Sequence, residues 1–304
     1  MPYSLEPLSH GAQHPPAGKD RPVTIDTHLH IWRKASGQHP WLLDSVEGQF
    51  DVYRWLMEKH GIDRAVIVGS KRGGNEDNNE YISSIVRANP DTFQAWGAVN
   101  LRSDDAVEQA AHCVDDLGLT GISMYMPAGE NFRFMLGPAL EPVWEGLVER
   151  RASFNTAVAA ADTAVIGNLA ERYPDLKIII AHMGRPIVEE PEPWPEWSTL
   201  SDLAKHPNVY VKLSGFYSFS LKGWGEIEYP YSEVKPFVKA LREAFGAERL
   251  TWGSDFTPCL AYMTYRQAHD FIDRHCDFLT DSDKEWIFGK TIMKIVSFAE
   301  PDDS

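Results

Sequence analysis

The sequence predicts an α/β fold, and within that class a (β/α)8 TIM barrel. Short apolar runs rich in β-branched residues recur along the chain, and segments with the apolar spacing of amphipathic helices separate them. Continuous apolar runs, such as residues 65–69 and 177–181, are typical of parallel strands covered on both faces. Eight strand–helix repeats make the closed barrel the leading fold. A doubly wound open sheet is the alternative, because strand number does not by itself prove closure.

The predicted strands and helices alternate along the chain. Strands are expected at residues 23–28, 65–69, 94–99, 121–125, 153–158, 177–182, 209–213 and 249–253. Helices are expected at residues 50–60, 78–88, 104–117, 142–151, 163–173, 232–245, 264–276 and 281–298. Local signals bound several of the helices: Gly61 and Gly118 follow two of them, Asn89 and Pro90 follow another, and Asp281 is a candidate N-cap for the last.

Two connections are unusually long and aromatic. Residues 184–199 follow the sixth strand, and residues 214–231 follow the seventh. Both would lie at the carboxyl ends of the strands, where barrel active sites are found. Their aromatic residues are Trp194, Trp197, Phe216, Tyr217, Phe219 and Trp224. We expect them to form the walls of a substrate pocket, with a dimer contact or self-packed loops as the alternative.

Composition excludes several classes of partner. The 304 residues are 43 % hydrophobic and 24 % charged, which is ordinary for a globular protein. The net charge of −15 repels phosphate backbones and anionic lipids, so we expect neither nucleic acid nor a membrane as partner. Three scattered cysteines fit a reducing cytoplasm. We expect residues 21–304 to form a single barrel domain and residues 1–20 a loosely ordered extension. The sequence leaves open whether the protein forms a homo-oligomer.

The strongest chemical signal is a pair of histidines at the end of the first predicted strand. The run DTHLHIW, residues 26–32, contains His28 and His30. Because side chains alternate along a strand, the two imidazoles face the same side and can bind one metal ion. By itself the pair is a weak signal, since paired histidines also occur on surfaces and in cores.

Two further motifs strengthen the interpretation of a metal site. His182 lies at the end of the sixth predicted strand, and Asp255 follows the eighth. The first and eighth strands are neighbours in a closed barrel, so His28, His30 and Asp255 would converge. A catalytic zinc site needs about three protein ligands and an open position for water. His182 would sit across the mouth, as a further candidate ligand or as a general acid or base.

Taken together, these motifs resemble the amidohydrolase superfamily, and within it the amidohydrolase-related (amidohydrolase 2) branch. The resemblance rests on DTHLHIW, IIIAHMGRP and LTWGSDFTP, which occur in this order at three strand ends. It covers roughly residues 23–298. The branch includes lactonases of pyrone dicarboxylate, of sugar lactones and of muconolactone type, and decarboxylases that share the architecture. The resemblance is therefore specific for the superfamily but not for the substrate.

The resemblance also implies roles for single residues. It implies metal contact for His28, His30 and Asp255, proton acceptance by Asp255, and polarisation of substrate or water by His182. Two-metal members and the decarboxylases place another ligating histidine on the fifth strand, whereas residues 152–158 contain none. This departure indicates one divalent metal, with Zn2+ as the first choice, or catalysis without a metal.

The expected function is hydrolysis of a small, carboxylate-bearing lactone. Asp255, a single divalent metal ion, or both would activate the attacking water. The alternative enzyme is a metal-dependent non-oxidative decarboxylase of an aromatic or enol acid, which the missing fifth-strand histidine disfavours. A non-catalytic binding barrel is the third alternative, and the retention of all three motifs argues against it.

Residues near the strand ends are the candidates for substrate binding. They are Arg72, Arg133, Arg185, Tyr125, Tyr217, Trp32 and Ser70. The three arginines follow the second, fourth and sixth strands of an otherwise acidic chain, and arginine suits bidentate recognition of carboxylates. Their placement favours an anionic substrate. Solvent-facing positions are the alternative, because the chain has 29 lysines and arginines in all.

Overall fold

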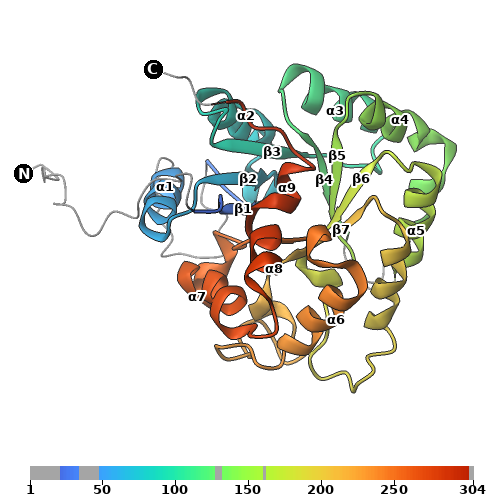
Figure 1. The fold of residues 1–304 in the computed structure, drawn as a ribbon. Helices are drawn as coiled ribbons and strands as arrows, with labels where there is room; N and C mark the ends of the chain where they lie inside the picture. Colours follow the sequence, from blue (N-terminus) through green and yellow to red (C-terminus); the bar gives the residue numbers. More distant parts are fainter. Residues whose placement is uncertain (1–20, 34–47, 127–131, 160–161, 301–304) are drawn as a thin grey trace, which may run out of the picture.

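The computed structural model describes residues 21–33, 48–126, 132–159 and 162–300, so the predicted extension at residues 1–20 lies outside the described part. Eight parallel strands form one sheet in the order β1 to β8 (Figure 1). The strands are β1 (Ile25–Leu29), β2 (Arg64–Val68), β3 (Phe93–Ala98), β4 (Gly121–Tyr125), β5 (Ser153–Ala157), β6 (Lys177–Ile180), β7 (Val209–Leu213) and β8 (Leu250–Trp252). All eight occur where short apolar runs predicted them.

The sheet closes on itself between its first and last strands, which confirms the predicted TIM barrel. Leu29, at the end of β1, forms a parallel bridge with Phe256, which lies just beyond β8. The His30 N–H donates to the Phe256 carbonyl at 2.5 Å, and the Asp255 N–H donates to the His28 carbonyl at 2.8 Å. These bonds form the seam between β1 and residues 253–256, and they rule out the doubly wound open sheet.

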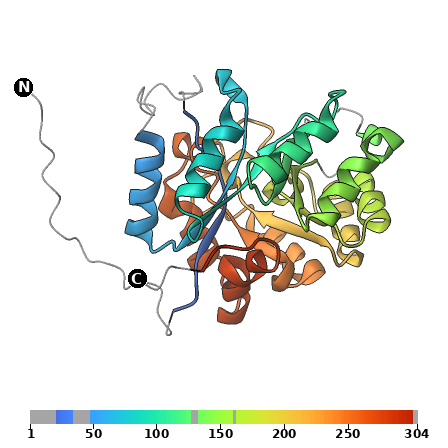
Figure 2. The same cartoon turned by 90° about the horizontal axis from the view of Figure 1, so that it is seen from above.

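Helices surround the strands (Figures 1 and 2). The α-helices are α1 (Gly48–His60), α2 (Asn78–Ala88), α3 (Ala106–Ala111), α4 (Glu141–Glu149), α5 (Thr163–Arg172), α6 (Lys235–Phe245), α7 (Tyr265–Asp270), α8 (Asp281–Glu285) and α9 (Thr291–Met293). π-helical turns follow three of them: η2 (His112–Asp116) after α3, η11 (Phe271–His275) after α7, and η12 (Trp286–Lys290) after α8. The predicted last helix ends early, at Met293, because the next apolar side chains, Ile295 and Val296, turn onto the barrel.

Apolar side chains fill one end of the barrel interior. This cluster contains Ile25, Val66, Val68, Trp96, Ile179, Tyr210, Ile292, Ile295 and Val296. Ile25 is the first residue of β1, whereas His28 and His30 lie at the other end of the same strand and face a cavity. The barrel is therefore a packed core at its base and an open site at the carboxyl ends of its strands.

Asp26 ties β1 to the segment that follows β8. Its carboxylate is fully buried. It accepts hydrogen bonds from Ser254 N at 2.9 Å, Ser254 Oγ at 2.6 Å, Tyr265 OH at 2.9 Å, Tyr53 OH at 3.0 Å and His28 N at 3.2 Å. Burial raises the pKa of Asp26, while the hydrogen bonds from Ser254 and His28 oppose that shift. One carboxylate thus joins β1, α1, α7 and the end of β8.

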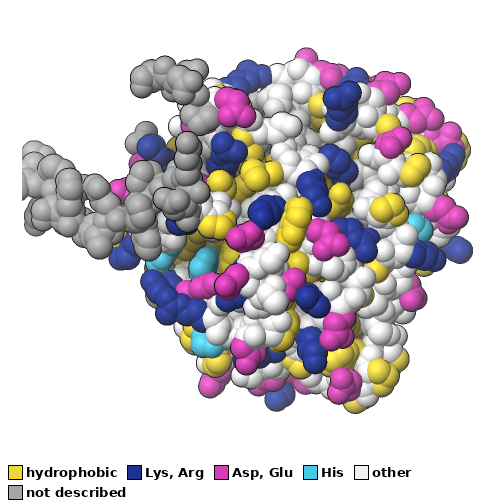
Figure 3. Space-filling model, in the orientation of Figure 1, with side chains coloured by type: hydrophobic (Ala, Val, Ile, Leu, Met, Phe, Trp, Pro, Cys, Tyr) yellow, Lys and Arg dark blue, Asp and Glu magenta, His cyan; other side chains and the backbone are white. Residues whose placement is uncertain are grey.

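Charge is dispersed over the face of the molecule seen in Figure 3. Acidic and basic side chains are interspersed there, with apolar side chains among them. This mixture spreads the net charge of −15 instead of gathering it into one patch on that face. Within the described ranges, no helix combines the length and the apolar character needed to cross a lipid bilayer.

We predict that Asp26→Asn destabilises the fold. The substitution keeps the size of the side chain but turns one acceptor oxygen into an N–H donor that faces hydroxyl donors. We expect a loss of about 3 kcal/mol of unfolding free energy, and hence a Tm lower by roughly 5–10 °C. Thermal unfolding followed by circular dichroism measures this change. The exposed Asp277→Asn is the matched control, and equal Tm values for the two variants would contradict the role of Asp26.

Candidate active site

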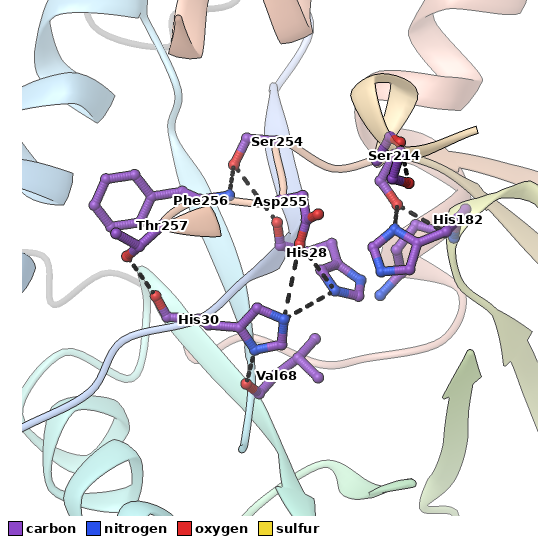
Figure 4. A network of polar contacts seen from close by, with 12 residues as sticks. His28, His30, Val68, His182, Ser214, Ser254, Asp255, Phe256 and Thr257 are labelled. Atoms are coloured by element: carbon purple, nitrogen blue, oxygen red, sulfur yellow. Dashed lines mark hydrogen bonds and ion pairs between the residues drawn. The ribbon is translucent and has the colours of Figure 1, made fainter. Parts of the chain in front are cut away.

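Two histidines from the end of β1 form the first part of the site (Figure 4). The Nε2 atoms of His28 and His30 lie 3.3 Å apart. His30 Nδ1 lies 2.8 Å from the Val68 carbonyl oxygen, which can only accept a hydrogen bond. The proton of a neutral His30 is therefore on Nδ1, and the Nε2 lone pair is free to bind a metal ion.

Asp255 completes this group from the other side of the seam. Its Oδ1 atom lies 3.6 Å from His28 Nε2 and 3.8 Å from His30 Nε2. Its Oδ2 atom accepts a hydrogen bond of 2.7 Å from the Tyr217 hydroxyl. Gly253 allows the close approach of the two chain segments, because a Cβ atom there would lie 2.4 Å from His28 Cβ.

The three side chains fit a divalent metal ion. Their ligand atoms all lie within 4.8 Å of one another. Four ligands at about 2.1 Å from a tetrahedral zinc are about 3.4 Å from each other, close to the spacing described above. Two imidazoles and one carboxylate leave one tetrahedral position for water or substrate, which is typical of a catalytic zinc site.

Burial sets the protonation states of the group. It lowers the pKa of His28 well below its usual value and lowers that of His30 to about 4, so both imidazoles are neutral near pH 7. Burial also raises the pKa of Asp255 to about 7, and the Tyr217 hydrogen bond opposes that shift. Neutral histidines have the lone pairs that metal binding requires.

His182 approaches the group from the turn after β6, in η6 (His182–Gly184). Its ring centroid lies 4.5 Å from that of His28, and its Nδ1 atom lies 3.0 Å from Ser214 Oγ. Burial lowers its pKa well below the usual value. His182 is not part of the group of ligand atoms within 4.8 Å. Gly215 leaves room for it, because a Cβ atom there would lie 2.6 Å from His182 Nδ1.

Backbone strain marks both acid–base candidates. His182 has a φ of 53° and Asp255 a φ of 59°, in the left-handed region that residues other than glycine adopt infrequently. Each such residue costs on the order of 1 kcal/mol, and functional sites are where such costs gather. The two turns aim both side chains into the mouth of the barrel.

A cavity of about 520 Å³ opens above these side chains, within the size range of small-molecule sites. The sequence-predicted residues that line it are His28, His30, Trp32, Ser70, Arg72, Tyr125, His182, Arg185, Tyr217 and Asp255. Trp32 stacks on His30 with 5.3 Å between ring centroids, and its Nε1 donates to the Ser70 carbonyl at 2.8 Å. The structure therefore brings together all but one of the predicted site residues.

Arg133 is the exception. It begins η3 (Arg133–Leu136), is exposed, and is not among the residues that line the cavity. Arg72 and Arg185 do line it, and both guanidinium groups lie over the Tyr125 ring, at 4.8 and 4.5 Å from its centroid. The alternation of β4 directs Tyr125 toward the cavity, where its ring contacts both guanidinium groups.

The two long connections contribute less than the sequence predicted. Tyr217 and Trp224 line the cavity, and their rings are 5.9 Å apart. In contrast, Trp194 and Trp197 pack on Phe237 of α6, with ring centroids 4.5 and 4.8 Å from it. The predicted aromatic wall is therefore wrong for these two tryptophans, and also for Phe216 and Phe219, which are buried and do not line the cavity. The large apolar surfaces of the two tryptophans cover the outer face of the barrel instead.

Sequence reasoning missed several polar residues of the site. Ser123, Asn155 and Ser218 line the cavity, and Ser214 contacts His182. Lys212 lies fully buried in the barrel interior. Alternation along β5 and β7 is the signal that marks Asn155 and Lys212 as inward-facing, but it does not reveal what they touch.

An eight-stranded barrel with two histidines at the end of β1, a histidine after β6 and an aspartate after β8 is the arrangement of a barrel hydrolase with a candidate metal site. The chain belongs to the amidohydrolase family, whose model, described as Amidohydrolase, matches residues 25–298. This match confirms the family that the three motifs predicted.

Several known proteins are similar to this chain. An L-fucono-1,5-lactonase from Burkholderia ambifaria is 29 % identical over 240 residues, covering 76 % of this chain and 79 % of the relative. A 4-sulfomuconolactone hydrolase from Hydrogenophaga intermedia is 24 % identical, covering 82 % and 79 %. Among solved structures, an amidohydrolase from Burkholderia multivorans with bound zinc has a TM-score of 0.76 at 20 % identity, covering 90 % and 98 %. A 2,6-dihydroxybenzoate decarboxylase from Rhizobium has a TM-score of 0.63 at 17 % identity, covering 90 % and 98 %.

We predict that Tyr217→Phe raises the pKa of Asp255 above about 7 in the metal-free protein. The hydroxyl donates to the ionised carboxylate and stabilises it, so its removal favours the protonated form by about one pKa unit. A 13C NMR titration of the labelled carboxyl carbon measures the change. Tyr229→Phe, which removes a hydroxyl bonded to His275, is the matched control. A titration midpoint shared by both variants would contradict the prediction.

Proposed function

We propose that this protein is a lactonase that opens a small, carboxylate-bearing lactone. The observation that carries the proposal is Asp255, a buried carboxylate held by Tyr217 and facing His28 and His30 in a cavity of substrate size. The similarity to lactonases that act on two different lactones supports it. Both are proteins that hydrolyse a cyclic ester, which is an activated acyl group.

Asp255 is the proposed proton acceptor. Water adds to the lactone carbonyl carbon while Asp255 takes one of its protons, and the ring C–O bond then breaks. The departing alkoxide oxygen takes a proton from the Asp255 carboxyl, which gives a hydroxy acid and restores the carboxylate. A pKa near 7 suits both halves of this exchange at neutral pH.

His182 is proposed to polarise the carbonyl oxygen. Ser214 Oγ lies 3.0 Å from its Nδ1 atom and can donate to it, which leaves the proton of the neutral ring on Nε2. That N–H can then donate to the oxygen that becomes negative during attack. A zinc ion held by His28, His30 and Asp255 would add Lewis-acid polarisation of the carbonyl or the water.

The carboxylate of the substrate is proposed to bind at the arginines. Arg72 and Arg185 both lie against the Tyr125 ring, and Lys71 also lines the cavity. Three cationic side chains beside neutral histidines make the cavity attractive to anions, although the chain as a whole is acidic. A cytoplasmic location is proposed with it, since Cys113, Cys259 and Cys276 are free thiols.

A direct assay of substrate classes tests the proposal. We expect hydrolysis of 2-pyrone-4,6-dicarboxylate, and weaker hydrolysis of the uncharged L-fucono-1,5-lactone, both measured as proton release in weakly buffered solution. Asp255→Asn should lower kcat by about 10²- to 10⁴-fold, because the proton acceptor is lost. Asp277→Asn is the control and should retain full activity. Release of CO2 from 2,6-dihydroxybenzoate without lactone hydrolysis would instead support the alternative decarboxylase.

We predict that the zinc content depends on the histidines and the aspartate at the seam between β1 and residues 253–256. We expect about one zinc per chain by elemental analysis of protein purified without an affinity tag. His30→Ala should lower that content by at least about tenfold, since a three-ligand site loses one ligand. His112→Ala removes an exposed histidine and should leave it unchanged. A protein that is fully active without metal would show that Asp255 and the histidines act alone.

We predict that Arg72 and Arg185 recognise the carboxylate of the substrate. Arg72→Ala and Arg185→Ala should each raise the KM for 2-pyrone-4,6-dicarboxylate by about tenfold, the value of one charge-assisted hydrogen bond. The uncharged L-fucono-1,5-lactone should be affected by less than about twofold. Arg133→Ala is the matched control, because Arg133 lies outside the cavity lining. Equal effects of all three substitutions would contradict the assignment.

A further inference from the structure

A buried lysine occupies the middle of the barrel. Lys212, on β7, has no exposed surface. Its Nζ atom donates to the Thr27 carbonyl at 2.7 Å and to Asn155 Oδ1 at 2.8 Å. In a third direction Nζ lies 4.4 Å from the centroid of the Trp96 ring. The side chain therefore reaches from β7 to β1, β3 and β5 across the interior.

These contacts satisfy an ammonium group without a carboxylate. An ammonium has three N–H donors and no acceptor. Two of its donors meet oxygen atoms, and the third direction faces the electron-rich side of Trp96, as expected for a cation. Burial lowers the pKa of Lys212 well below its usual value, and the negative charges of Asp26 and Asp255 oppose that shift. Burying an ammonium is costly, and a costly interior group indicates a role beyond packing.

The ammonium determines which way the Asn155 amide points. Because Nζ can only donate, it requires Oδ1 of Asn155 on its side and turns Nδ2 the other way. Nδ2 then donates to Ser123 Oγ at 2.9 Å. Asn155 and Ser123 both line the cavity. A directed series of donors thus runs from Lys212 through Asn155 to Ser123.

Two donors remain at the cavity end of this series. Nδ2 of Asn155 has two N–H groups, and in the described ranges Ser123 is its one hydrogen-bond acceptor. Ser123 Oγ accepts that bond, so its own O–H is left to donate. Each bond in the series polarises the next and strengthens the final donors. Both side chains are at least nine-tenths buried and both line the cavity, so a bound substrate can accept these two donors.

Asn155 and Ser123 lie on the side of the barrel opposite the seam. β5 is opposite β1 in the strand order of the barrel, so Asn155 faces His28 and His30 across the cavity. We infer that Asn155 and Ser123 form a subsite for a hydrogen-bond-accepting oxygen of the substrate. Lys212 is a positioning residue for this subsite. The inference rests on the proposed lactonase function and adds a second contact region to it.

Reversing the polarity of the amide tests the subsite. Asn155→Asp replaces the donor by an acceptor of equal size, and its pairing with Lys212 preserves the fold. Binding of 2-pyrone-4,6-dicarboxylate and L-fucono-1,5-lactone is measured calorimetrically in the Asp255→Asn background, where turnover does not interfere. We expect the Kd of the pyrone to rise about thirtyfold, and Ser123→Ala to raise it about fivefold. If only the pyrone binds more weakly, the bound oxygen belongs to a carboxylate. If both lactones bind more weakly, it is a carbonyl oxygen.

Matched variants separate this role from a structural one. Thr156→Ser, on the same strand but outside the cavity lining, should leave Kd unchanged. Zinc content and Tm of Asn155→Asp should equal those of the parent. An unchanged Kd for both lactones, or no binding of either, overturns the subsite. Because binding is measured without turnover, a protein that binds but does not hydrolyse lactones refutes the lactonase proposal and leaves the subsite supported.

A double-mutant cycle tests the part played by Lys212. Lys212→Met removes the charge but keeps the length of the side chain, and we expect it to raise the Kd of the pyrone about threefold by freeing the amide. In an Asn155→Ala background the same substitution should have no effect on Kd. A Lys212 effect that persists without Asn155 overturns the positioning role. If Lys212→Met does not fold, Asn155→Asp and Ser123→Ala still decide whether the subsite exists.

Discussion

The seam between β1 and residues 253–256 is the constraint on which the rest of the site depends. His28 and His30 come from one side of the seam and Asp255 from the other, so their convergence requires closure of the barrel. Closure in turn depends on Asp26, which holds the turn after β8 through both the backbone and the hydroxyl of Ser254. The Asp26 carboxylate does not line the cavity, and it holds in place the chain segments that carry His28 and Asp255.

Burial gives the site its electrostatic character. The chain carries a net charge of −15, yet the cavity combines neutral histidines with cationic side chains at its rim. Desolvation keeps His28 and His30 uncharged and raises the pKa of Asp255 toward neutrality. The same physical effect therefore produces the neutral imidazoles and the perturbed carboxyl group on which the proposed metal binding and proton transfer depend. The acidic exterior and the anion-attracting interior are separate regions of one protein.

The interior of the barrel is polar where it meets the cavity. Apolar side chains fill its base, whereas Lys212 and Asn155 lie nearer the carboxyl ends of the strands. Because an ammonium in this position must be surrounded by acceptors, it imposes a direction on each neighbouring hydrogen bond. The seam on one side and the donor series on the other define the two walls between which a substrate would bind.

The sequence by itself determined the order of strands and helices, the three motifs and the family, because strand ends and ligand spacing are local properties. It also marked Arg72, Arg185 and Tyr125 by their positions after strands. Only the tertiary structure decided that Trp194 and Trp197 cover α6, that Arg133 lies outside the cavity, and that Lys212 orients Asn155. These outcomes depend on contacts between segments far apart in the chain. Period-two alternation tells which face a residue occupies, but only packing determines which partner it meets there.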